Sequence, residues 1–174
     1  MALRPGRCYN KPYKTPYTRV AIRVPKKSYV KGVPQPKIFH FEMGTRRNDY
    51  KVAYHLVMDR SIAIRSNALE AARIAAHKYL SDTVGNANYF LKVRTVPYHV
   101  LRENPLATGA GADRFSQGMR RAFGKPIGVA ALVERGQKVM SIYIPEGRER
   151  EAKEALRRAA MKLPGSPRIV KENL

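Results

Sequence analysis

The side chains best suited to chemistry in this chain are cations and tyrosines near its start. Residues 1–41 hold ten lysines and arginines and no acid. These cations are Arg4, Arg7, Lys11, Lys14, Arg19, Arg23, Lys26, Lys27, Lys31 and Lys37. The tyrosines among them are Tyr9, Tyr13, Tyr17 and Tyr29. Cations that neutralise phosphates release counterions, and tyrosine rings stack on unpaired bases, so this segment predicts RNA binding.

A glycine-rich stretch over residues 102–126 is the second candidate site. It contains four glycines, five basic residues and two acids. Connections longer than about 12–15 residues usually carry a function, and glycine lets the backbone approach another surface closely. Arginine can pair with two phosphate oxygens at once. We therefore expect a functional loop that reaches into RNA, and the residues assigned to it are Arg102, Gly109, Gly111, Arg114, Arg120, Arg121 and Lys125.

Enzymatic chemistry has weaker support in the sequence. The segment Gly118–Lys125 is similar to a nucleotide-binding P-loop, but five residues instead of four separate its glycines, and Pro126 stands where a hydroxyl would ligate magnesium. None of the four histidines stands in a triad context. We expect His55 and His77 to be packed or at the surface, and His40 and His99 to lie at an edge or to face RNA. No catalytic residue is assigned.

The composition argues against disulfide-bonded, metal-binding and membrane proteins. The single Cys8 excludes an internal disulfide and a cysteine-rich zinc site, and the histidines lack metal-ligand spacing, so neither a metal nor a cofactor is expected. No apolar run approaches the roughly 18–20 residues of a membrane span. Narrow alanine stripes also argue against a helix that lies on a membrane. We expect a soluble, cytoplasmic chain without a membrane partner.

Net charge extends the same argument to the whole chain. The 174 residues carry 34 basic and 13 acidic side chains, a formal net charge of +21. Such a charge repels itself in the compact state, and a polyanionic partner relieves that repulsion. Apolar residues make up 44% of the sequence, which is enough to bury a core.

Prolines divide the chain into an arm and a body. Six of the first 36 residues are proline, and each removes an amide donor and favours extended backbone before it. We predict an extended basic arm over residues 1–36, with a short edge strand at Thr18–Val24. A single α+β RNA-binding domain is expected over residues 37–174.

Two helices are predicted in the body. Asn67 is placed to cap the first, with Glu70 reaching back to the free amide, and this helix runs to about Leu80. The second spans about Glu146–Lys162, with its acids early and its cations late, which complements the helix dipole. The apolar stripes of the two helices are Leu69, Ala72, Ala76 and Leu80, and Ala152, Leu156, Ala159 and Leu163.

Several strands are predicted from alternating and β-branched residues. They are Tyr50–Met58, Tyr89–Val96, a hairpin of Ile127–Glu134 with Lys138–Pro145 around Gly136, and Arg168–Lys171. Two helices among mostly antiparallel strands give an α+β fold, a sheet covered by helices in a two-layer α/β sandwich.

Five segments of the sequence, taken together with their order and spacing, identify a protein family more specifically than any one of them does. They are RPGRCY (Arg4–Tyr9), SNALEAARIAAHKYL (Ser66–Leu80), HVLRENPLATGAGADR (His99–Arg114), GMRRAFGKPIG (Gly118–Gly128) and EALRRAAMKLPG (Glu154–Gly165). Together they resemble the archaeal and eukaryotic large-subunit ribosomal proteins called L-ten-e, relatives of bacterial L-sixteen. Asn10 departs from the arginine that several relatives carry there. The absence of a long extension beyond Leu174 makes the chain similar to archaeal members.

The resemblance implies a structural constituent of the large ribosomal subunit that binds the large rRNA and performs no catalysis. In that family the glycine-rich loop points toward the space between the aminoacyl and peptidyl tRNA sites, near the peptidyl transferase centre. Carried over to residues 102–126, this loop would help to position tRNA in both sites. The other implied partners are neighbouring ribosomal proteins. The alternatives are a nucleotide-binding enzyme and a basic RNA-binding protein outside the ribosome.

The expected rRNA contacts are basic residues of the arm and of the body. They are Arg4, Arg7, Lys11, Lys14, Arg19, Arg23, Lys26, Lys27, Arg46, Arg47 and Arg94.

Overall fold

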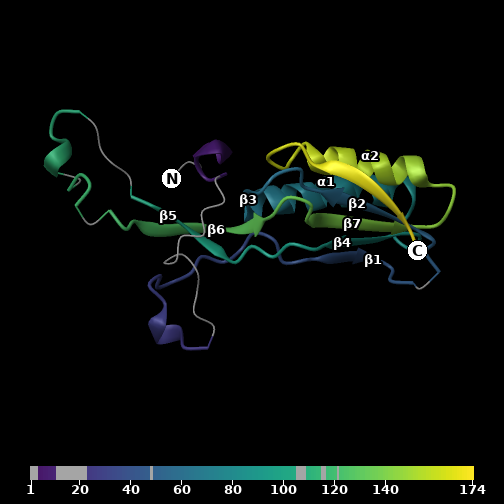
Figure 1. Ribbon diagram of the computed structural model, residues 1–174, viewed down its shortest axis with the longest axis horizontal. Helices are drawn as coiled ribbons and strands as arrows, with labels where there is room; N and C mark the ends of the chain where they lie inside the picture. Colours follow the sequence, from purple (N-terminus) through teal and green to yellow (C-terminus); the bar gives the residue numbers. More distant parts are fainter. Residues whose placement is uncertain (1–3, 11–22, 48, 105–108, 115–116, 121) are drawn as a thin grey trace.

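The computed structural model describes residues 4–10, 23–47, 49–104, 109–114, 117–120 and 122–174. Two α-helices lie side by side on one face of the β-structure, and a ribbon of β5 and β6 projects from one end of the elongated molecule (Figure 1). Strands that pair are antiparallel throughout the described residues. The expected α+β class is therefore confirmed.

The larger sheet has five strands in the order β1-β4-β7-β2-β8. Their bounds are Glu42–Gly44 for β1, Phe90–Val93 for β4, Lys138–Ile144 for β7, Val52–Val57 for β2 and Arg168–Asn173 for β8. The strands expected around Tyr54, Leu91 and Val170 are thus present. The expected strand Tyr89–Val96 ends early, at Val93, because the chain then crosses to the smaller sheet.

The smaller sheet has three strands in the order β3-β6-β5. Its strands are Ile62–Arg65 for β3, Lys125–Val133 for β6 and His99–Glu103 for β5. Neither β3 nor β5 is among the predicted strands. Because β5 ends at Glu103 and β6 begins at Lys125, the connection between them is shorter at both ends than the predicted loop.

The predicted hairpin around Gly136 is wrong. Strands β6 and β7 follow each other closely in the chain, but β6 pairs with β3 and β5 while β7 pairs with β2 and β4. The connecting turn is held instead by Met58, whose amide donates to the Gln137 carbonyl at 3.1 Å and whose carbonyl accepts from the Gly136 amide at 2.8 Å. The chain therefore changes sheet at this turn.

The two helices cover the core as predicted, although the first begins differently. Helix α1 spans Ser66–Thr83 and α2 spans Glu149–Ala160. All eight predicted stripe residues are buried. Asn67 lies inside α1 and no side chain caps the helix, while Glu70 accepts from Arg73 one turn later. Neither α-helix, within the described chain, is long and apolar enough to cross a membrane.

The region before β1 is described only in part. Residues 4–10 contain the short 3-10 helix Gly6–Cys8, and residues 23–41 contain another at Pro25–Lys27. Of the predicted edge strand Thr18–Val24, residues 18–22 lie outside the described chain, and Arg23 and Val24 are not in a strand. The proposed boundary between an arm and a body at residue 36 stays a prediction.

Candidate nucleic-acid interface

The loop between β5 and β6 stands at the far end of the ribbon, away from the helices (Figure 1). Its described residues include a 3-10 turn, Ala112–Arg114, and glycines at 109, 111, 118 and 124 with positive φ. A Cβ on Gly124 would lie 2.7 Å from the Glu103 backbone carbon, so only glycine allows the two stems to approach here. Arg114, Arg120 and Lys125 are exposed on this loop and its stem.

Arg102 has a different role from the other predicted loop cations. Its guanidinium carbon lies 3.7 Å from the centre of the Phe123 ring, and Nη1 donates to the Phe123 carbonyl. Its Nε is buried and has no partner within the described residues. Arg102 therefore fastens the outgoing stem to the returning stem, a contact that the sequence alone did not indicate.

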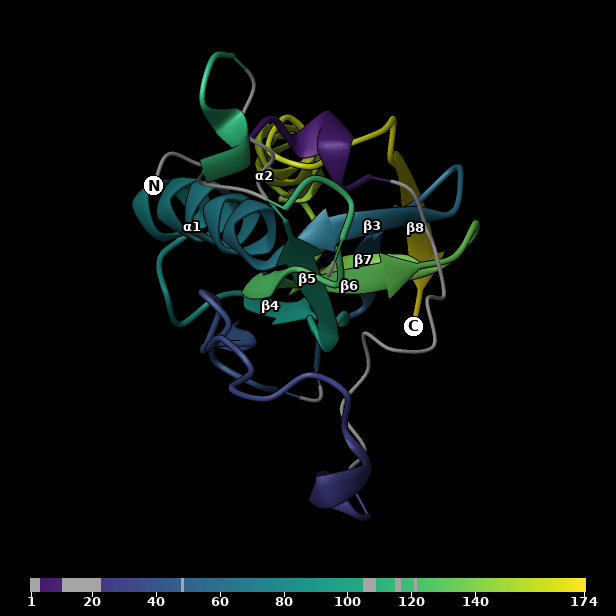
Figure 2. The same ribbon diagram turned by 90° about the vertical axis from the view of Figure 1, so that its left-hand side faces the viewer.

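Cations of the segment before β1 lie at the same end of the molecule as the loop. Arg7, Arg23, Lys26 and Lys27 are exposed. Seen from this end, the segment with Pro25–Lys27 and the loop extend to opposite sides of the three-stranded sheet (Figure 2). No ion pair within the described chain involves these four residues or Arg114, Arg120 and Lys125. The predicted contacts Lys11, Lys14, Arg19 and Arg121 lie outside the described residues.

The first described residues are bound to the body near Glu103. Arg4 forms an ion pair with Glu103, and the Tyr9 hydroxyl donates to the same carboxylate at 2.8 Å. Burial, followed by the hydrogen bond to Glu103, raises the pKa of Tyr9 to about 12. Arg65 donates to the Arg4 carbonyl at 2.8 Å, and the Asn10 carbonyl accepts from the Ala63 amide at 3.1 Å. Arg4 thus helps to hold this segment in place.

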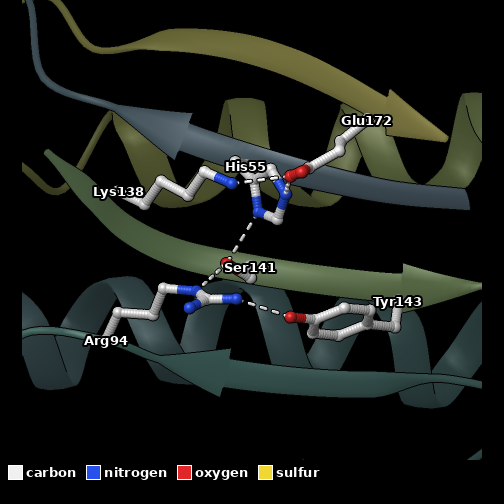
Figure 3. Close-up of polar contacts among 6 residues, drawn as sticks. All are labelled: His55, Arg94, Lys138, Ser141, Tyr143 and Glu172. Atoms are coloured by element: carbon white, nitrogen blue, oxygen red, sulfur yellow. Dashed lines mark hydrogen bonds and ion pairs between the residues drawn. The ribbon is translucent and has the colours of Figure 1, made fainter. Parts of the chain in front are cut away.

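The remaining predicted contacts lie elsewhere. Arg46 and Arg47 are exposed just after β1, and this segment lies at the end of the molecule opposite the loop (Figure 1). Arg94 lies on the face of the five-stranded sheet that the helices leave uncovered (Figure 3). Its Nε donates to Ser141 Oγ and its Nη2 to the Tyr143 hydroxyl, both at 2.5 Å.

A polar network crosses this uncovered sheet face from β4 to β8 (Figure 3). His55 is only 1% exposed, and its Nδ1 lies 2.8 Å from Ser141 Oγ while its Nε2 lies 2.6 Å from Glu172 Oε2. Burial lowers the pKa of His55, so its neutral form is favoured. Because Arg94 donates to Ser141, the Ser141 hydroxyl proton is free to point at Nδ1, which leaves the His55 proton on Nε2 facing Glu172.

Acids neutralise the lysines on the same sheet face. Lys138 donates to Glu172 at 2.6 Å, and Lys92 donates to Glu42 at 2.6 Å. The hydrogen bond from Lys138 is the main reason that the pKa of Glu172 is lowered. This network was not predicted, because its members are far apart in the sequence. His99 lies on β5, an edge strand of the three-stranded sheet, as the expected edge position requires, and its side chain is buried.

The P-loop alternative does not fit the fold. In a P-loop the lysine opens a helix whose amino end holds the phosphates. Lys125 instead opens strand β6. Within the described residues no group of three or more His, Cys, Asp or Glu is placed to hold a metal ion.

An α+β body with exposed cations that lack acidic partners, on the loop and on the segments beside the three-stranded sheet, is typical of a protein that binds a polyanion. The family model described as Ribosomal protein L16p/L10e matches residues 12–170. That match covers most of the chain, and the chain belongs to this family.

Curated relatives are similar over almost their whole length. The large ribosomal subunit protein uL16 of Staphylothermus marinus is 55% identical over 170 residues, which is 98% of this chain and 94% of the relative. The protein of the same name from Archaeoglobus fulgidus is 48% identical over 172 residues, 99% of this chain and 94% of the relative. The protein of that name from Methanococcus maripaludis is 47% identical over 170 residues, which is 98% of this chain and 94% of the relative. The expected kinship with archaeal large-subunit proteins is confirmed.

Proposed function

We propose that this chain is a structural constituent of the large subunit of cytoplasmic ribosomes, held on rRNA by the end of the molecule that carries the loop. One observation carries this proposal: seven exposed cations lie on the loop, on its stem and on the segments beside the three-stranded sheet, and none is in an ion pair within the described chain. They are Arg7, Arg23, Lys26, Lys27, Arg114, Arg120 and Lys125. Phosphates of folded RNA would supply the missing negative charge.

The binding chemistry is recognition of shape more than of base sequence. Folded RNA presents phosphates and 2′-hydroxyls over a wide surface, and cations on either side of the three-stranded sheet can contact both. The arm proposed over residues 1–36 adds further cations to this contact. Neighbouring ribosomal proteins are the proposed partners of the remaining surface.

The glycine-rich loop is proposed to reach tRNA in the aminoacyl and peptidyl sites, near the peptidyl transferase centre. The ribbon carries it away from the body, and the contact of Arg102 with Phe123 fixes its base. Arg114 and Arg120 are exposed on the loop, and together with Arg121 they are proposed to contact tRNA or the rRNA around it. RNA performs peptide-bond chemistry in this proposal, and the protein positions its substrates.

Replacing Arg114, Arg120 and Arg121 together by alanine tests the loop. We expect a nearly unchanged melting temperature, because no described contact of the body depends on Arg114 or Arg120, and a loss of tRNA binding by reconstituted large subunits. A matched control replaces three exposed cations outside this end, Arg135, Arg150 and Lys162. A loss of several degrees in melting temperature, or equal tRNA binding by both variants, would contradict the proposed role.

A further inference from the structure

A cavity of about 370 Å³ lies between the start of α1, strands β5 and β6, and the segments before β1. Residues that line it include Arg4, Tyr9, Arg65, Ser66, Leu101 and Gly128. Its volume is in the range of sites that bind small molecules. The cavity adjoins the Arg4–Glu103–Tyr9 contact, so the segment that begins the chain forms one of its walls.

One end of the cavity is electropositive because helix α1 starts there. The helix has 18 residues, no side chain caps it, and its first turn contains no acid. Its first amides therefore keep their partial positive charge, which favours an anion. Ser66, the first residue of α1, lines the cavity and is 7% exposed. The side-chain hydrogen bonds of the described residues do not include the Ser66 hydroxyl, so this nearly buried polar group on the cavity wall can bond to a ligand.

The other walls combine cations with apolar surface. Arg65 lies with its guanidinium carbon 5.7 Å from the centre of the Tyr9 ring. Arg4, Lys37 and Arg65 face the cavity against a single acid, Glu103, which already pairs with Arg4. Pro34, Leu101 and Ile127 contribute apolar surface. A ligand that matches these walls is an anion joined to a flat, mostly apolar group.

We propose that this cavity receives one everted nucleotide of the bound RNA. The phosphate would lie at the start of α1, within reach of the Ser66 hydroxyl and the first amides, and the base would enter among Tyr9, Leu101 and Ile127. Bases of single-stranded or bulged RNA are bound in this way, stacked on aromatic rings and arginine planes. The inference deepens the proposed rRNA binding and depends on it.

Ser66→Asp is the sharpest test because it separates folding from binding. An acid in the first turn of a helix favours the helix, so the melting temperature should be unchanged or higher. The same charge should repel a phosphate. The probes are adenosine and uridine 5′-monophosphate, followed through the amide NMR signals of Ser66–Leu69 in the full chain. We expect at least a tenfold loss of affinity in this variant, and no loss in Ser166→Asp, which adds the same charge at an exposed residue.

Gly128→Leu tests the space itself. A Cβ on Gly128 would meet no atom within 4 Å and its φ is not positive, so a side chain can be added without strain. We expect this variant to fold and to bind the monophosphates at least tenfold more weakly. Unchanged binding in both Gly128→Leu and Ser66→Asp would overturn the proposal.

Two further probes identify the ligand. Inorganic phosphate should bind more weakly than the monophosphates, and equal affinity would show that no base enters. A short single-stranded oligonucleotide should shift the same amide signals, and its failure would point to a free nucleotide and overturn the assignment to RNA. If Ser66→Asp loses the monophosphates but keeps its salt-dependent affinity for rRNA, both proposals hold. If rRNA binding itself is absent, the proposed function fails.

Discussion

The uncovered face of the five-stranded sheet and the end that carries the loop both contain many cations, yet they use them differently. On the sheet face, Lys92 and Lys138 pair with acids, and Arg94 donates to Ser141 and Tyr143. At the loop end, cations such as Lys26 and Arg120 are exposed, and the described ion pairs do not include them. Net charge alone therefore does not locate an RNA contact, because a cation that already has an acid contributes less to phosphate binding.

The largest expected effect is on rRNA binding, and it compares the exposed cations at the loop end with the paired cations of the sheet face. Replacing Arg23, Lys26 and Lys27 by alanine should weaken binding to a large-subunit rRNA transcript roughly tenfold or more near physiological salt. The slope of log affinity against log salt should fall by about 2–3, since each phosphate contact contributes about 0.7–0.9. Filter binding or fluorescence anisotropy between low and physiological salt would measure both.

The matched control replaces three lysines that have acidic partners, Lys92, Lys138 and Lys171. It removes the same charge, so any effect of net charge alone is common to both variants. We expect a change in slope of less than about 1 in the control. Equal slopes in the two variants would abolish the distinction between paired and unpaired cations.

A second prediction concerns the base of the loop. Gly124→Ala should lower the free energy of unfolding by about 1–3 kcal/mol, because alanine is strained at φ 78° and its Cβ would overlap the Glu103 backbone. Gly118→Ala shares the positive φ but would meet no atom within 4 Å, so its cost should be smaller. Urea unfolding compares the two, and equal costs would show that the close approach at Glu103 is unimportant.

The smallest expected effect is a dependence of protein stability on pH, to which His55 on the uncovered sheet face contributes. Burial lowers the pKa of His55, His77 and His99 below the value of about 6.5 that they have in the unfolded chain. The unfolded state therefore binds more protons below about pH 6.5, and stability should fall as the pH is lowered from 7 to 5. In His55→Gln, urea unfolding at pH 7, 6 and 5 should show a shallower fall. An identical fall would mean that His55 takes up its proton in the native state.

The helices and several strands could be predicted because the pattern of apolar residues that specifies each of them lies within one continuous segment of the chain. The alanine and leucine stripes of α1 and α2 and the alternation from Tyr89 to Arg94 each specify a buried face without reference to the rest of the chain. The false hairpin shows the limit of such signals. Two strand-like runs around Gly136 look alike whether they pair with each other or with β2, β3, β4 and β5, and only contacts distant in sequence decide between these pairings.

For the candidate site, too, the sequence indicated the segment but not the contacts between distant residues. Charge and glycine content directed attention to residues 102–126, but they did not separate Arg102 and Arg94, which have partners inside the protein, from Arg114 and Arg120, which are exposed. The partners are Phe123, Ser141 and Tyr143, and no spacing rule relates them to these arginines. The cavity at Ser66 was equally hidden, since its walls come from segments far apart in the chain.

The turn clasped by Met58 joins the distant loop to the middle of the protein. Strand β6 leaves the loop and continues through this turn into β7, which has a neighbour on both sides in the five-stranded sheet. The direction in which the loop points therefore depends on the pairing of β6 with β3 and β5 and on its continuation into a central strand. A mechanical load at the loop tip would pass first to the ladders that hold β6 between β3 and β5, and then through the turn at Met58 to β7.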